Sequence, residues 1–177
     1  MNSSEYLLKQ VDWQWFMTFT WNDTNLGSIY TRENNVDKFL RRYAAHEQVS
    51  LSDLPMVTRW ERGEMTQRPH CHVLLTGLPN VSRITKGYGF ALMAAWYRRY
   101  GLARIRPWHA ELRSAVGQYF TKGLDRLDKP HVCGSMTSAN EYEIVKFNRA
   151  DRLVFNQALW AHLQSLTGTA FEVSPST

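Results

Sequence analysis

Large apolar residues alternate with polar ones along residues 13–21, which is the pattern of a strand with one side in a core. Its apolar positions of one parity are Trp15, Met17, Phe19 and Trp21. Two more strands are predicted over 55–61 and 70–76. The polar residues between these two strands include a glycine and predict a long hairpin loop, so the two strands should be antiparallel.

Helical spacing of apolar residues predicts the segments between and after these strands. A first helix should begin at Asn34 or Asn35 as N-cap, with an apolar stripe of Val36, Phe39, Leu40 and Tyr43. A second helix is expected over 90–100, ended by Gly101, with Leu92, Met93, Trp96 and Tyr97 facing inward. Further helices are expected over 111–122 and 151–166, the last with Leu153, Leu159, Trp160 and Leu163 on its apolar side.

A fourth strand is predicted over 102–108, where Arg104 and Arg106 share one face and Pro107 indicates the edge of a sheet. The order is then β-α-β-β-α-β, the split βαβ arrangement of ferredoxin-like α+β folds, followed by helices. We expect a single domain over 1–177, with a core of about 10–125 and a C-terminal extension. Helices should cover one face of the antiparallel sheet and leave the other face for a site. No element is predicted for 125–149.

Composition narrows the class of protein only moderately. The chain has 177 residues and a net charge of +5, which permits a polyanionic partner without requiring one. Two cysteines cannot form a disulfide framework, and no apolar run approaches the ~18 residues of a membrane helix. The N-terminus lacks the layout of a signal peptide, so a cytoplasmic protein without membrane contact is expected.

Two histidines stand two residues apart in the predicted strand 70–76. His70 and His72 therefore share one face, whereas Cys71, Val73 and Leu75 share the other face, in the core. Two imidazoles side by side on a rigid strand are half of a metal site, although two surface histidines would give the same pattern.

A carboxylate can complete that metal site. In the hairpin, Glu61 should lie across from the histidines, whereas Glu64 falls in the loop. Two histidines and a carboxylate leave coordination positions open, which suits Mg²⁺ or Mn²⁺ bound together with a phosphate. No cysteine spacing predicts a structural zinc site.

A tyrosine and a lysine lie one turn apart on the predicted helix 111–122. Tyr119 and Lys122 follow the stripe that neighbours its apolar face. A phenol is a poor nucleophile near neutral pH unless a cation favours the phenolate or polarises the electrophile. Taken alone, this pair is an ordinary amphipathic tyrosine beside a lysine.

In combination, the aromatic first strand, the His-x-His strand and the later Tyr-x-x-Lys helix resemble the HUH endonuclease superfamily. The resemblance is carried by residues 13–21, 59–77 and 115–124 and is nearest to the rolling-circle replication initiator (Rep) proteins. The family usually has a bulky residue between the two histidines, where this chain has Cys71.

The resemblance implies the HUH nuclease fold and a role for each residue. Glu61, His70 and His72 would hold Mg²⁺ or Mn²⁺, Tyr119 would attack a phosphodiester of single-stranded DNA, and Lys122 would steady the developing charge. The single-tyrosine motif is closer to Rep proteins than to two-tyrosine relaxases, since Tyr142 is too distant to count. The partner would be single-stranded DNA at a replication origin. The chain has no P-loop motif, so either it is an isolated nuclease domain or the full protein borrows a host helicase, which would act in trans.

Several arginines near these motifs are candidates for contacts with DNA phosphates, while each alone would be an ordinary surface charge. They are Arg59, Arg62, Arg68, Arg104, Arg106 and Arg126. Tyr88 and Trp108 are candidates for stacking on bases.

Other functions fit parts of the pattern. A single-tyrosine transposase shares the same constellation, and a non-catalytic descendant would keep only origin binding. An RRM-like module would need neither metal nor tyrosine. A zinc deaminase is a poor fit because no P-C-x-x-C motif occurs. The host compartment would be a prokaryotic cytoplasm, or a nucleus for a eukaryotic virus.

Overall fold

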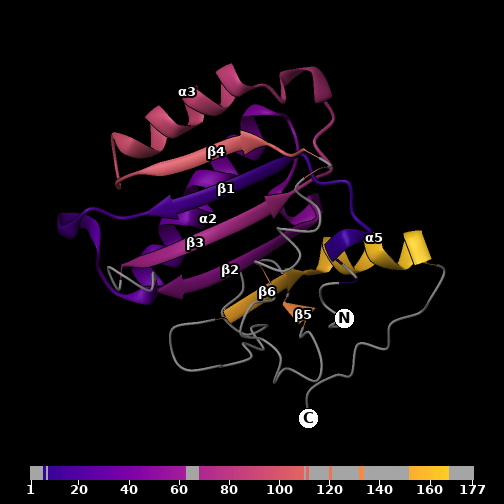
Figure 1. Cartoon of the computed structure of the whole chain (residues 1–177), viewed down its shortest axis with the longest axis horizontal. Coiled ribbons are helices and arrows are strands. Elements are labelled where there is room, and N and C mark those ends of the chain that lie inside the picture. The colour runs from indigo at the N-terminus through magenta and orange to yellow at the C-terminus, as the bar shows by residue number, and fades with distance from the viewer. Residues whose placement is uncertain are drawn as a thin grey trace, which may run out of the picture.

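A single mixed sheet organises the chain. The computed structural model describes residues 6, 8–62, 68–109, 111, 120, 132–133 and 152–167. The strands are β1 (Trp15–Thr20), β2 (Met56–Arg62), β3 (Pro69–Leu75), β4 (Ala103–Pro107), β5 (Val132–Cys133) and β6 (Arg152–Asn156). They lie in the order β4-β1-β3-β2-β6-β5 (Figure 1). The first five strands in this order are antiparallel to their neighbours, whereas β5 runs parallel to β6.

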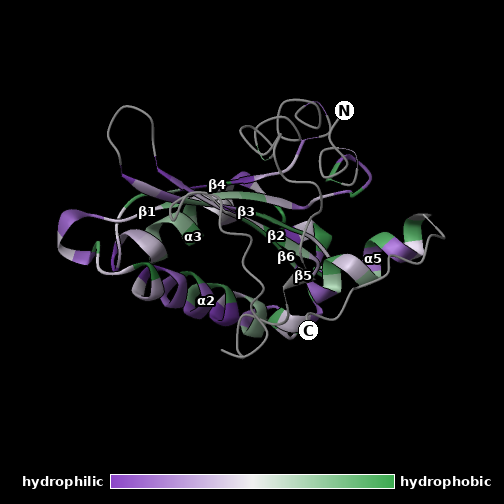
Figure 2. Ribbon diagram, turned by 90° about the horizontal axis from the view of Figure 1, so that it is seen from below, coloured by the Kyte–Doolittle hydropathy of each residue, from purple (hydrophilic) through white to green (hydrophobic). Residues whose placement is uncertain are grey.

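The helices lie on one face of the sheet and at its β6 end. α2 (Ile29–His46) and α3 (Lys86–Tyr97) lie on one face, and α5 (Gln157–Thr167) lies beyond the β6 end of the sheet (Figure 2). Short 3-10 turns occupy Asp23–Asn25, Leu51–Asp53 and Val81–Arg83. The α+β class, the antiparallel hairpin of β2 with β3, and the predicted element order up to β4 are confirmed.

The main core lies between the sheet and the helices α2 and α3. Trp15, Met17 and Phe19 point into it from β1 and are fully buried, as their parity predicts. Trp96 of α3 is also fully buried and packs on Phe19 at 4.4 Å between ring centroids. The indole N–H of Trp96 donates to the carbonyl of Thr20 at 3.0 Å, so the helix is fixed to the end of β1 by packing and by a hydrogen bond.

A second apolar cluster covers part of the opposite face, which was expected to be open. It is built on Phe16, Val57 and Leu74 from the central strands, and Phe120 packs over Phe16. The other members come from the N-terminal segment, β6 and α5: Leu8, Val11, Trp13, Leu153, Phe155, Leu159, Trp160 and Leu163. The uncovered region of this face is therefore narrower than the sequence predicts.

The helices α2 and α3 begin earlier than predicted. α2 starts at Ile29, because the side chain of Ser28 accepts a hydrogen bond from the backbone N–H of Thr31, and Asn34 and Asn35 lie inside the helix. α3 starts at Lys86 with Thr85 as N-cap.

The inward orientation predicted for Tyr97 of α3 is wrong. Leu92 and Trp96 are buried as expected, but the side chain of Tyr97 is 65% exposed. α3 ends at Tyr97, before the predicted stop at Gly101.

The predicted helix over 151–166 is wrong in its first third. Residues 152–156 form β6, which pairs with β2, and the helix begins only at Gln157. Leu153 and Phe155 alternate with Val154 between them, so the period is two in this stretch, and the apolar residues Leu159, Trp160 and Leu163 then follow helical spacing. A segment predicted as an extension thus adds a strand to the sheet.

Some predictions fall on other parts of the chain. Most of the helix expected over 111–122 and most of 125–149 lie outside the described residues. Across the part that the structure describes, no helix has the length and apolar character needed to cross a bilayer.

Beneath the main core, two tyrosines and a carboxylate join α2 to α3. The hydroxyl of Tyr88 donates to Glu47 Oε1 at 2.9 Å, and the hydroxyl of Tyr43 accepts from the Trp15 indole at 2.7 Å. Burial, followed by the hydrogen bond to Glu47, raises the pKa of Tyr88 to about 12. Burial also raises the pKa of Tyr43.

We expect this pair to make the fold sensitive to alkali. A phenol whose pKa is raised on folding contributes stability that is complete below pH ~10 and is lost as pH rises toward the folded pKa. Urea unfolding between pH 8 and pH 12 should therefore show stability falling above pH ~10. Tyr88→Phe should reduce that fall, whereas Tyr97→Phe, an exposed tyrosine of the same helix, should leave it unchanged. Equal pH profiles for wild type and Tyr88→Phe would contradict this interpretation.

Candidate functional site

The face of the sheet opposite α2 and α3, called here the site face, carries the polar residues that the sequence singles out. Strand register aligns Arg104, Thr18, His72 and Arg59 in one row across β4, β1, β3 and β2. The next row pairs His70 with Glu61. Because side chains alternate along a strand, residues in both rows project to the same side. The predicted placement of both histidines and Glu61 on one face is confirmed.

Glu61 and His72 contact each other directly on this face. Glu61 Oε1 lies 3.0 Å from His72 Nε2, on a diagonal across the hairpin. The side chains are 16% and 6% exposed, respectively. An interaction between a carboxylate and an imidazole is strengthened by such partial burial. The ring nitrogen and the oxygen that meet here are both atoms that bind divalent cations.

His70 lies beside this pair with an unused ring nitrogen. Its ring centroid is 6.2 Å from that of His72, and its Nδ1 atom is buried without a hydrogen-bond partner. Burial, and then the neighbouring His72, lower the pKa of His70 from its ordinary value. The neutral imidazole that a metal requires is therefore the favoured form at neutral pH.

The donor types fit a hard or borderline divalent cation. Two imidazoles and one carboxylate come from adjacent strands, and the unpaired Nδ1 of His70 is a buried polar atom that a ligand would satisfy. Within the described ranges, no three histidine, cysteine, aspartate or glutamate side chains are already gathered closely enough to hold a metal ion. The structure thus brings Glu61 and His72 together and leaves His70 adjacent to them.

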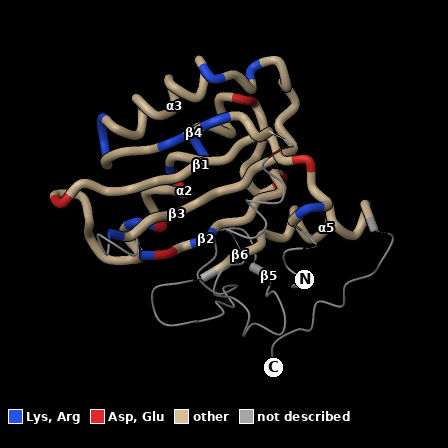
Figure 3. The backbone as a smooth tube through the Cα atoms, viewed as in Figure 1, with Lys and Arg blue, Asp and Glu red and all other residues tan. Residues whose placement is uncertain are grey.

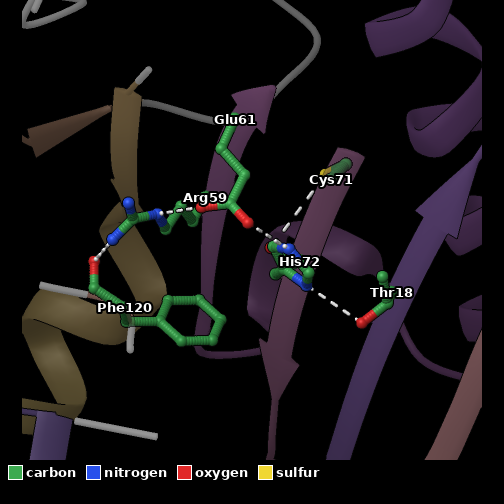
Figure 4. A network of polar contacts seen from close by, with 6 residues as sticks. All are labelled: Thr18, Arg59, Glu61, Cys71, His72 and Phe120. Atoms are coloured by element: carbon green, nitrogen blue, oxygen red, sulfur yellow. Dashed lines mark hydrogen bonds and ion pairs between the residues drawn. The ribbon is translucent and has the colours of Figure 1, made fainter. Parts of the chain in front are cut away.

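Thr18 is part of the site but was not predicted from the sequence. Its hydroxyl lies 2.9 Å from His72 Nδ1, so both ring nitrogens of His72 are engaged (Figure 4). A hydroxyl can donate or accept, so Thr18 can hold the ring of His72 in either tautomer. The sequence feature that could have revealed Thr18 is the alternation along the first strand, which places it on the side opposite the core residues Met17 and Phe19.

Arg59 occupies a different position from the surface contact that was predicted. It is 6% exposed, its Nε donates to Glu61 Oε2 at 3.0 Å, and its Nη1 donates to the carbonyl of Phe120 at 2.8 Å. A guanidinium with this burial and these partners is not presented to a DNA phosphate. We therefore remove Arg59 from the candidate DNA contacts.

The other predicted DNA contacts are distributed unevenly. Arg104 on β4 and Arg62 at the end of β2 are exposed, whereas Arg68 forms an ion pair with Asp23 at 3.0 Å. Arg106 is half-buried, with its guanidinium 5.2 Å from the centre of the Phe16 ring. Basic positions consequently follow β4 along one edge of the site face (Figure 3).

A small pocket opens at the end of the hairpin next to the metal candidates. Glu61, His70 and Arg62 line it, together with Arg32 from α2. Burial, and then the neighbouring Arg62, lower the pKa of Arg32. Such a pocket favours an anionic group beside Glu61 and His70.

Several predicted residues lie outside the described ranges. They are Tyr119, Lys122, Arg126 and the competing ligand Glu64. Phe120, which follows Tyr119 in the sequence, is described and is fully buried on the site face. Its ring centroid is 6.1 Å from that of Phe16 and 6.4 Å from that of His72.

No family model, curated protein or solved structure matches the chain. The functional argument therefore depends on the geometry of the site face and on the sequence motifs themselves.

The structure disfavours Tyr88 as a base-stacking residue. Tyr88 lies on α3, under the helical side of the sheet, and its hydroxyl is bonded to Glu47. Trp108 is half-buried against the second apolar cluster, next to the end of β4. Of these two residues, Trp108 is the one near the site face.

Proposed function

We propose that this protein is a metal-dependent endonuclease and strand-joining enzyme for single-stranded DNA, of the HUH type, that initiates rolling-circle replication. The observation that carries the proposal is the contact of Glu61 with His72, beside His70, on the site face. The connectivity β-α-β-β-α-β with the order β4-β1-β3-β2 is that of split βαβ folds and supports the HUH assignment.

The metal site would be made by Glu61, His70 and His72. A divalent cation bound there supplies a Lewis acid that polarises the scissile phosphate. The protein holds the carboxylate and the His72 ring in place before any ligand arrives, since Thr18 and Arg59 engage their remaining polar atoms. Such preorganisation is what an electrostatic catalyst requires.

The nucleophile would be the phenol oxygen of Tyr119. It bonds to phosphorus while the bond from phosphorus to the 3′ oxygen breaks, and the 3′ oxygen leaves and takes a proton from solvent to become a free hydroxyl. The phenol proton passes to solvent, and the 5′ phosphate remains on the tyrosine. Lys122 would stabilise the charge on the phosphate. A 3′ hydroxyl attacking the phosphotyrosine reverses the step and rejoins a strand.

Substrate binding would use the exposed cations around this site. Arg104 stands in the same cross-strand row as His72, and Arg62 lines the pocket beside Glu61. Contacts of this kind position a backbone without reading its sequence. The partner is a single strand at an origin, and a helicase from the host would open the duplex.

A non-catalytic RRM-like module fits the site face less well. Such modules stack bases on aromatic residues exposed on the central strands. Here the aromatic residue of β1 on this face, Phe16, is 8% exposed and lies under Phe120. The central positions are occupied instead by Thr18, His72 and Glu61.

The test is covalent capture of DNA by the wild-type protein. The protein is incubated with a pool of labelled single-stranded oligonucleotides, with Mn²⁺ or with EDTA, and resolved on denaturing gels. We expect a protein–DNA adduct in the samples with Mn²⁺ and none in the samples with EDTA. Peptide mass spectrometry should locate the nucleotide on Tyr119. The cleaved 3′ fragment should be the one attached, with a free 3′ hydroxyl on the other fragment.

Two outcomes would overturn the proposal. Metal-independent binding with no adduct across a well-sampled pool would favour a binding module. An adduct that maps to another residue would reject the assigned nucleophile.

A further inference from the structure

A buried arginine connects the candidate metal site to the segment that contains the candidate nucleophile. Arg59 lies on β2, and its side chain is only 7% exposed. Burying a guanidinium is costly unless its N–H groups are paired. Here the pairing partners are a carboxylate on its own strand and a backbone carbonyl at residue 120.

The contacts form one continuous chain across the site face. Thr18 Oγ1 is 2.9 Å from His72 Nδ1, and His72 Nε2 is 3.0 Å from Glu61 Oε1. The second carboxylate oxygen of Glu61 accepts from Arg59 Nε at 3.0 Å, and Arg59 Nη1 donates to the carbonyl of Phe120 at 2.8 Å. Figure 4 shows that these residues come from three strands and from a separate segment.

The geometry of this series of contacts requires a guanidinium at position 59. Arg59 uses two N–H groups of one planar fork, in fixed relative orientation, to bond Glu61 and Phe120 at the same time. A lysine has a single flexible ammonium and does not reproduce that fork. Phe120 is anchored further by its ring contacts with Phe16 and His72.

We propose that Arg59 is a positioning residue that fixes the segment of the nucleophile to the metal-binding carboxylate Glu61. The inference rests on the proposed function, because Phe120 matters through its neighbour Tyr119. Nucleophilic attack needs reacting atoms within a few tenths of an ångström of the productive geometry. Because one guanidinium bonds both the Glu61 carboxylate and the Phe120 carbonyl, it sets the distance between these two groups. It also orients the carboxylate for a cation.

The experiment compares Arg59→Met and Arg59→Lys with Arg99→Met, a change at an exposed arginine that follows α3 and has no place in the proposed site. Adduct formation is timed at saturating oligonucleotide and saturating Mn²⁺. Affinity for the same oligonucleotide and its salt dependence are measured by fluorescence anisotropy. Affinity for Mn²⁺ alone is measured by calorimetry, without DNA.

We expect both Arg59 variants to form adduct about 10–100-fold more slowly at saturation, because a misplacement of about 1 Å has an effect of that size. DNA affinity and its salt dependence should stay unchanged in these variants. Arg59→Met should also weaken Mn²⁺ binding about 10-fold, as loss of an outer-shell partner does. Arg99→Met should leave the saturated rate, the DNA affinity and the Mn²⁺ affinity unchanged, because Arg99 lies outside the proposed site.

Three results would overturn the inference. A saturated rate in Arg59→Met equal to wild type would show that the connection has no effect on chemistry. A loss of DNA affinity with a shallower salt dependence would make Arg59 a phosphate contact. Full activity in Arg59→Lys would show that charge alone suffices, and this variant decides the matter if Arg59→Met does not fold.

Failure of the proposed function is distinguishable from failure of this inference. An absence of adduct in the wild type would reject the nuclease, whereas a wild-type adduct with an unaffected Arg59→Met rejects only the role of Arg59. Mn²⁺ affinity tests the orientation of Glu61 by Arg59 whether or not DNA is cut.

Discussion

Replacing Tyr119 by phenylalanine is expected to abolish the covalent protein–DNA adduct, lowering its rate about 10³-fold or more, to the limit of detection. The substitution removes one oxygen, which is the atom that would bond to phosphorus, and keeps the aromatic ring. Binding of single-stranded DNA and of Mn²⁺ should therefore persist. The measurement is adduct formation on denaturing gels with the oligonucleotide that the wild type selects.

A second tyrosine outside the core motif provides the control for this experiment. Tyr142→Phe removes the same atom from a residue that the sequence motif does not include, and it should leave adduct formation at the wild-type rate. Persistence of the adduct in Tyr119→Phe, with loss in Tyr142→Phe, would transfer the role to Tyr142. Loss in both variants would indicate a two-tyrosine mechanism instead.

The strand pattern predicts the most important part of the site. A period of two places His70 and His72 on one side of β3 and Cys71 on the other, and the structure has this arrangement, with Cys71 fully buried. The hairpin places Glu61 opposite His70: strands that follow each other in the sequence pair antiparallel, and the loop that joins them sets the register. These relations are local, so alternation along the chain is enough to reveal them.

The parts that were missed depend on contacts between distant residues. The sequence gives Arg59 the same appearance as any exposed arginine, and only the carbonyl of Phe120, 61 positions away, shows that it is buried and bonded. Likewise β6 pairs with β2 about a hundred residues earlier in the chain, as the bond from Met56 N–H to Asn156 Oδ1 illustrates. A short stretch with three consecutive apolar residues, Leu153, Val154 and Phe155, fits a strand or the start of a helix until its partner is known.

The largest expected loss of stability comes from a glycine after α3. Gly101 has φ +153°, and the residues on either side of it bond to the end of β1 and the chain beyond it. Asn22 N–H donates to the carbonyl of Tyr100, and Thr20 N–H donates to that of Leu102. A Cβ at Gly101 would lie 2.6 Å from the Asn22 nitrogen and 2.7 Å from the Thr20 oxygen. Both are backbone atoms, which cannot rotate away.

Gly101→Ala is therefore expected to destabilise the fold by about 3–5 kcal/mol, combining backbone strain of ~1–3 kcal/mol with overpacking of similar size. At about 2–4 °C per kcal/mol for a chain of this length, Tm should fall by about 10 °C. Differential scanning calorimetry measures this directly. Because β1 and β4 carry Thr18 and Arg104, residual activity should fall together with folded protein.

Gly87 provides the matched control, because it lies in the first turn of α3 and a Cβ there would meet only Thr85 Oγ1, at 4.0 Å. Gly87→Ala should leave Tm unchanged or raise stability by up to about 0.5–1 kcal/mol, since alanine favours the helix. A Gly101→Ala protein as stable as wild type would mean that α3 and β4 can shift away from β1. The close packing of Trp96 on Phe19 makes such a shift costly, because separating the helix from the strand would open a cavity in the main core.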